Sequence, residues 1–291
     1  MAFDAEAIRA EFPILARQVN GKPLVYLDSA ASAQKPRAVI DAMVRAMEYS
    51  YSNVHRGLHT LANETTEAYE KARQSAADFI NADLAEIVFT KGGTEAINLV
   101  ASGLGASLKA GDEILLTEME HHANIVPWHF LRERQGVVLK FVPVLDDGQL
   151  DMAAIPDLLS ARTRVVALTH MSNVLGTVNP VAQIIAMAHD AGALVLLDGC
   201  QAIVHQPIDV KALDVDFYVF SGHKLYGPTG IGILYGKAER LAELPPYQGG
   251  GEMISSVALD AISYADPPHR FEAGTPPILE AIGLGAAIDW F

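Results

Sequence analysis

One lysine of this sequence lies where a side chain is suited to covalent chemistry. Ser221, Gly222, His223 and Lys224 directly follow residues 217–220, a short apolar segment with the pattern of a buried strand. Partial removal from water at a strand end favours the neutral amine of a lysine, which is a nucleophile for an aldehyde. Ser221 and His223 could hold a phosphate group of the aldehyde that reacts with the lysine. The segment therefore predicts a reactive lysine, with a solvated loop lysine as the alternative.

A carboxylate stands in a matching position earlier in the chain. Asp198 ends the apolar segment 193–198, and a carboxylate at the end of a buried strand needs a partner. A protonated pyridine nitrogen is such a partner, and enzymes that use pyridoxal 5′-phosphate (PLP) pair that nitrogen with an acidic side chain. Together with Lys224, Asp198 predicts a PLP site. A capping or salt-bridged aspartate is the alternative.

A phosphate site is predicted where Gly92, Gly93 and Thr94 join a strand to a helix. Free backbone N–H groups and the helix dipole at such a junction attract an anion. A plain turn in which Thr94 caps the helix is an equally good interpretation of this segment alone.

Other polar residues that follow predicted strands could contact the pyridine ring. His122 could stack on the ring, and Asn173 and Gln201 could reach its hydroxyl, although each could also be a turn residue. A metal site built from His121 and His122 is disfavoured, because adjacent residues chelate poorly and no zinc-type spacing completes a ligand set.

The elements that would position these residues alternate along the chain. We expect strands at residues 23–28, 86–90, 113–117, 139–144, 164–169, 193–198, 217–220 and 231–235. We expect helices at residues 4–14, after Pro36, and at 63–80, 94–104, 123–135, 152–159, 181–191 and 278–290. Short continuous apolar strands between helices indicate an α/β fold with a mostly parallel sheet covered on both faces. Ligands of such sheets bind beyond the carboxyl ends of the strands.

The composition disfavours several classes of partner. The 291 residues carry a formal net charge of −14, and this acidic balance gives no basic patch for nucleic acid. The chain has no apolar run near the roughly 20 residues that cross a bilayer and no signal-peptide pattern. The single cysteine, Cys200, fits a reducing cytoplasm. The glycines at 103–105 fall at a predicted helix end, which argues against a nicotinamide-binding fingerprint.

Residues 221–235 closely resemble the PLP-lysine segment of cysteine desulfurases in the class V aminotransferase group. Segments 26–31, 53–59, 93–98, 120–124, 198–202 and 270–275 resemble the SUF-system branch, which overlaps with selenocysteine lyases. The resemblance implies a type I aminotransferase-like PLP fold with a mostly parallel seven-stranded sheet. Residues 1–20 would then form an N-terminal helical segment and 21–262 the large PLP-binding domain. Residues 263–291 would begin the connection to a small C-terminal domain.

The resemblance also implies roles for individual residues. Lys224 would carry PLP covalently, and Lys224 or His122 would move protons. His122 would stack on the ring, and Asp198 would pair with its nitrogen. The remaining roles are Asn173 and Gln201 near the ring oxygen, Thr94, Ser221 and His223 at the phosphate, Thr275 at the phosphate of a partner subunit, and His55, Arg56 and Asn173 near the substrate.

The activity implied is conversion of L-cysteine to L-alanine by a cytoplasmic homodimer, with the sulfur passed as persulfide to a SUF-type acceptor protein for iron–sulfur cluster assembly. L-Selenocysteine is an alternative substrate, and another class V PLP enzyme is an alternative activity. The family's nucleophilic cysteine loop and substrate-carboxylate arginine are expected beyond Phe291. Cys200 stands at a small-residue position and is no substitute by motif. We therefore expect weak PLP binding and little sulfide release from this chain, or a non-catalytic PLP-binding or dimerisation fragment.

Overall fold

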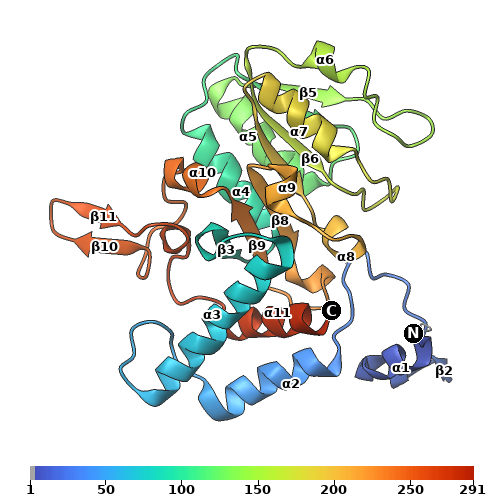
Figure 1. The fold of residues 1–291 in the computed structure, drawn as a ribbon, viewed down its shortest axis with the longest axis vertical. Helices are drawn as coiled ribbons and strands as arrows, with labels where there is room; N and C mark the ends of the chain where they lie inside the picture. The colour runs from blue at the N-terminus through green and yellow to red at the C-terminus, as the bar shows by residue number, and fades with distance from the viewer. Residues whose placement is uncertain (1–3) are drawn as a thin grey trace.

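The computed structural model describes residues 4–291 and has a seven-stranded sheet at its centre (Figure 1). The strands lie in the order β3-β9-β8-β7-β6-β4-β5. Their bounds are β3 Ile87–Thr90, β4 Glu113–Thr117, β5 Val138–Val142, β6 Thr163–Thr169, β7 Leu194–Asp198, β8 Phe217–Ser221 and β9 Gly232–Gly236. The predicted α/β fold with a mostly parallel seven-stranded sheet is confirmed.

Only β9 runs against its neighbours in this sheet. It pairs antiparallel with both β3 and β8, whereas β8, β7, β6, β4 and β5 pair in parallel. Consequently β3 points the same way as β8, and six strands end at one edge. The turns after these strands therefore meet in space although they are far apart in sequence.

Eleven α-helices occur among residues 4–291. Their bounds are α1 Ala5–Ala10, α2 Arg37–Arg45, α3 Thr60–Ile80, α4 Gly93–Gly105, α5 Val126–Gln135, α6 Ile155–Leu158, α7 Val181–Asp190, α8 Ala202–His205, α9 Val210–Leu213, α10 Ala238–Glu243 and α11 Ile278–Trp290. The helices predicted from apolar spacing are all present, although α1 and α6 are shorter than expected. None of the helices among residues 4–291 combines the length and the apolar character that a membrane-spanning helix needs.

The core has one layer on each face of the sheet, because side chains alternate along each strand. In β4, Leu115 joins the layer formed with α3, α7 and α11, whereas Ile114 and Leu116 join the layer formed with α4, α5 and α10. Trp128 of α5 is fully buried in the second layer. Both faces are thus covered, as continuous apolar strands require.

Helix α11 packs against α2 and α3 at the lower end of the molecule (Figure 1). Small residues allow the close approach: a Cβ added at Gly285 would lie 2.8 Å from the Ala72 Cβ, and one added at Gly283 would lie 2.8 Å from the Met43 sulfur. The predicted apolar helix at residues 278–290 is therefore a packed helix of the body.

One predicted strand is absent, and one hairpin was missed. Residues 23–28 were expected as a strand, but only Lys22–Pro23 (β2) pairs, with β1 at Gln18–Val19. Val25 and Leu27 remain 74% and 92% exposed, because no sheet edge lies beside them. The missed hairpin consists of β10 Ile254–Val257 and β11 Ile262–Tyr264 and projects from the body (Figure 1).

Candidate active site

A cavity of about 480 Å³ opens at the edge where the parallel strands end. Five turns contribute to its wall, namely those that follow β3, β4, β6, β7 and β8. The sequence-predicted residues that line it are Thr94, Asn173, Asp198, Gln201, Ser221, His223 and Lys224. The sheet order thus gathers most of the predicted site in one place.

Lys224 lies in the wall on a single 3₁₀ turn, Gly222–Lys224, that follows β8. The Gly222 amide donates to the Ile231 carbonyl at 2.9 Å, which anchors the start of the turn to the segment before β9. The His223 carbonyl accepts from the Ala33 amide at 3.0 Å. Burial and the positive charges of Lys224 and Lys35 lower the pKa of His223, so His223 is a neutral donor or acceptor at neutral pH.

The start of α4 forms a second wall. The Gly93 amide donates to the Ser221 hydroxyl at 2.8 Å, so α4 begins directly against the turn that carries Lys224. Gly92 has φ +151°, and a Cβ added at Gly93 would lie 2.8 Å from the Cys200 sulfur. The backbone here needs glycine, and the helix N-terminus faces the cavity at Gly93 and Thr94. Such a terminus favours an anion.

Asp198 lies in the same wall at the end of β7 and is buried. One carboxylate oxygen accepts from the Cys200 amide at 3.0 Å, which leaves the other oxygen for a ligand. Burial and the Asp198 charge together raise the pKa of the Cys200 thiol well above its usual range. Cys200 is therefore a partly buried neutral thiol, 3.6 Å from the Ser221 hydroxyl.

Gln201 contacts a wall built from residues 28–31, which had no predicted role at the site. Its side-chain amide donates to the Ala30 carbonyl at 2.8 Å, and Asp28, Ala30 and Ala31 line the cavity. Lys35 donates to the His223 carbonyl at 3.3 Å and holds the same segment against the Lys224 turn. The small and polar residues after residue 27 could have indicated this wall, but the segment was interpreted as the end of a strand and its turn.

The two adjacent histidines differ in position. Both residues are exposed, but His121 lines the cavity, whereas His122 begins the 3₁₀ turn His122–Asn124 and is not part of the lining. Their ring centroids lie 5.9 Å apart. The His121 ring accepts from the Ala123 amide at 3.1 Å, which fixes its orientation. The structure therefore places His121, and not the predicted His122, at the cavity.

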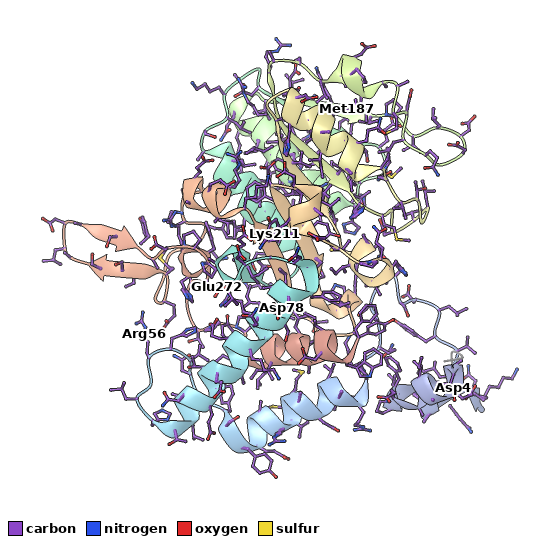
Figure 2. The ribbon with its side chains drawn as sticks, viewed as in Figure 1. Asp4, Arg56, Asp78, Met187, Lys211 and Glu272 are labelled. Carbon is purple, nitrogen blue, oxygen red and sulfur yellow. The ribbon has the colours of Figure 1, made fainter. Side chains whose placement is uncertain are left out.

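Three further predicted residues lie outside the lining. Thr275 is exposed. His55 lies 2.9 Å from Glu70, and Arg56 pairs with Glu252 at 2.9 Å. Figure 2 shows Arg56 on the side of the molecule where the hairpin projects. Within one copy of residues 4–291 these side chains are not brought to the cavity.

The described part of the chain, residues 4–291, contains no group of three or more His, Cys, Asp or Glu side chains arranged to hold a metal ion. The cavity instead combines an amine, a carboxylate and an anion-binding helix terminus.

Comparison with known proteins agrees with this arrangement. The sequence matches the aminotransferase class-V family over residues 25–291, and it is 58% identical over 293 aligned residues to a cysteine desulfurase of Serratia proteamaculans. The chain belongs to the cysteine desulfurase group of the class-V aminotransferase family. The alignment covers all of this chain and 72% of that relative.

Solved structures of the family share the fold. The cysteine desulfurase CsdA from Escherichia coli has a TM-score of 0.90 and 44% identity, over all of this chain and 72% of that one. A variant of C-DES with glycine covalently linked to its PLP cofactor has a TM-score of 0.84 and 30% identity, over 97% of this chain and 73% of that one. The cavity described above fits PLP, since it supplies a lysine, an acid for the ring nitrogen and a phosphate site.

Proposed function

We propose that this chain binds PLP in the cavity at the carboxyl edge of its sheet and uses it as a cysteine desulfurase does, to convert L-cysteine to L-alanine. The single observation that carries this proposal is the convergence of Lys224, Asp198 and the α4 N-terminus on one cavity. Bound PLP supplies an electron sink for the substrate carbon. The membership of the chain in the cysteine desulfurase group supports the same substrate.

In this proposal each part of the cavity wall contacts a different part of the cofactor. Lys224 holds the cofactor covalently, and its amine then carries the proton at the substrate α carbon. Asp198 pairs with the ring nitrogen. Gly93 and Thr94 offer the helix terminus to the phosphate, with Ser221 and His223 beside them.

The remaining ring contacts follow from the wall positions. We assign the ring face to His121 in place of His122, because only His121 lines the cavity. Asn173 and Gln201 are assigned to the ring oxygen, since both line the cavity.

The 291-residue chain by itself should release little sulfide. Desulfuration needs an enzyme thiolate that takes the substrate sulfur as persulfide before an acceptor protein receives it for iron–sulfur assembly. Cys200 is the one cysteine of the sequence. Its thiol stays protonated because burial and Asp198 raise its pKa, and only a thiolate is nucleophilic.

We further propose that the working form is a homodimer. Leu58, Leu27 and Val174, which are 101%, 92% and 82% exposed in one copy, would then be available for burial against the partner. Thr275 and the loop of His55 and Arg56, all outside the cavity of one copy, are then available to the cavity of the other. Analytical ultracentrifugation should give twice the mass of one chain, and a monomer would contradict the assignment.

The cofactor proposal is tested by visible absorbance. Purified chain incubated with PLP and freed of excess should show the band of lysine-bound cofactor, and Lys224→Ala should abolish it. Lys211→Ala is the matched control, because Lys211 is exposed and pairs with Asp83 on another part of the surface. An unchanged band in Lys224→Ala would exclude Lys224 as the attachment point.

The reaction class is tested by the products. With L-cysteine and a thiol reductant that releases the persulfide sulfur as sulfide, a desulfurase gives alanine and sulfide, whereas an aminotransferase gives a 2-oxo acid. Sulfide formed by the 291-residue chain at the rate of a full-length relative would contradict our proposal that Cys200 does not accept the substrate sulfur.

A further inference from the structure

Glu120 is a buried carboxylate just behind the cavity, on the turn that follows β4. One of its oxygens accepts from the Thr117 hydroxyl at 2.6 Å and from the Thr169 amide at 2.9 Å. The other oxygen accepts from the Asn124 side-chain amide at 2.7 Å. This carboxylate thus accepts three hydrogen bonds from neutral donors and forms no ion pair within residues 4–291.

The direction of each bond is fixed. The Trp128 indole N–H donates to the Asn124 side-chain oxygen at 3.0 Å, and an indole can only donate. Asn124 must therefore present its NH₂ group to Glu120. Burial raises the pKa of Glu120 to about 7, against the lowering effect of these hydrogen bonds. Above neutral pH the ionised form accepts all of them.

This carboxylate joins three pieces of the cavity frame. Thr117 ends β4, Thr169 ends β6, and Asn124 closes the short turn after His121. His121 and Thr169 themselves line the cavity. The turn between Glu120 and Asn124 is therefore held at both ends by one side chain, and His121 is the residue directly after Glu120.

We infer that Glu120 is a positioning residue that holds His121 at the cavity wall, where it can pack against the bound cofactor. This inference rests on the proposed function for the identity of the ligand. The action on His121 itself follows from the hydrogen bonds alone and can be measured without cofactor.

The network offers a sharp test, because it contains one donor–acceptor pair that can be exchanged. Glu120→Gln must turn its NH₂ group either toward the NH₂ of Asn124 or toward the Thr169 N–H, and Asn124 cannot turn over without facing the Trp128 N–H. Asn124→Asp places two carboxylates against each other. The double variant restores every bond with donor and acceptor exchanged, since the new amide donates to the new carboxylate, which still accepts from Trp128.

The experiment compares these variants at pH 8. We expect each single variant to lose about tenfold in PLP affinity, the scale of a lost hydrogen bond to a charged group, and to change the spectrum of the bound cofactor. The double variant should recover both. Glu118→Gln is the control, because Glu118 is exposed on the same turn and accepts only from the Val144 amide at 3.0 Å.

A second measurement uses cofactor-free protein. Backbone amide exchange in residues 119–124 should accelerate at least tenfold in both single variants, and the ring NMR signals of His121 should shift, while the double variant returns to the wild-type values. Because this measurement needs no cofactor, it tests the positioning role of Glu120 separately from the proposed PLP function. If wild-type protein binds no PLP, the proposed function fails, and exchange and His121 signals still decide the inference.

Two results would overturn the inference. One is wild-type PLP affinity and His121 signals in Glu120→Gln. The other is a double variant no better than the single variants, since a merely space-filling role for Glu120 predicts no rescue. Thermal melting of all four proteins identifies any variant that fails to fold, and rescue in the double variant then remains the deciding comparison.

Discussion

The Gly93 amide donates a 2.8 Å hydrogen bond to the Ser221 hydroxyl, and this contact joins the start of α4 to the turn that carries Lys224. Residues 128 positions apart in the chain therefore form one wall. The close approach is possible because Gly93 has no side chain between α4 and Cys200.

The first prediction follows from that approach. A Cβ at Gly93 would lie 2.8 Å from the Cys200 sulfur and 3.2 Å from the Ser221 oxygen. Gly93→Ala should therefore weaken PLP binding by at least about tenfold, which is about 1.4 kcal/mol. Adding Cys200→Ala removes the nearer clash and should recover most of the affinity in a fluorescence titration. Equal affinity in the single and double variants would show that the sulfur contact is not the obstacle.

The second prediction concerns charge at Asp198. Asp198→Asn keeps the shape and can still accept from the Cys200 amide, but it removes the negative charge that we assign to the ring nitrogen. We expect PLP affinity to fall roughly 10- to 100-fold, the range for a hydrogen bond to a charged group. The exposed Asp146→Asn variant should bind PLP as the wild type does. The readout is the dissociation constant from absorbance titration, and an unchanged value would remove Asp198 from the cofactor site.

The third prediction concerns a buried ion pair outside the cavity. Arg73 of α3 donates to both oxygens of Glu272, at 2.7 and 2.9 Å, and both side chains are buried. Arg73→Met should lower the free energy of unfolding by about 3–5 kcal/mol, because it leaves the Glu272 charge buried without a cationic partner.

Urea denaturation measures this loss. Adding Glu272→Gln to Arg73→Met should recover part of it, since the amide is neutral and its oxygen can still accept from the Phe89 amide, as Glu272 does at 2.8 Å. Lys71→Met, at an exposed position of the same helix, should change stability by no more than about 0.5 kcal/mol. A similarly small effect of Arg73→Met would show that the pair is dispensable.

The fourth prediction is a pH dependence set by His170. Burial lowers the pKa of His170 from 6.5 to about 4. The ring is held neutral between the Tyr218 hydroxyl at 3.3 Å and the Gln206 amide at 2.9 Å. Below pH 6.5 the unfolded chain takes up a proton at this histidine that the folded chain refuses, so stability falls as pH drops from 6.5 toward 4. The full loss is about 3 kcal/mol.

The measurement is the free energy of unfolding between pH 4 and 7. His170→Asn should be less stable at pH 7 and should show a slope smaller by about one proton. His129→Asn, at a half-exposed position, should keep the wild-type slope. An identical slope in His170→Asn would assign the acid sensitivity to other groups.

The sequence by itself identified the chemistry of the site, because that information is local. Lys224 and Asp198 each end or directly follow a continuous apolar segment, and such segments become buried strands wherever they lie in the chain. The strands of the central sheet and eight of the eleven helices among residues 4–291 followed from the same apolar periodicity, whereas the short helices α8, α9 and α10 were not predicted.

The tertiary structure decided what depends on neighbours distant in sequence. Residues 23–28 have the pattern of a strand, but no sheet edge lies beside them, and residues 24–28 form no strand. Asp28, at the end of this segment, lines the cavity instead. The sequence could not distinguish His121 from His122, because side-chain direction in a turn depends on what holds the turn. Here Glu120 holds it, through Thr169 on another strand. Apolar patterns determine which residues reach the sheet edge, and packing between separate strands determines which of their side chains face the ligand.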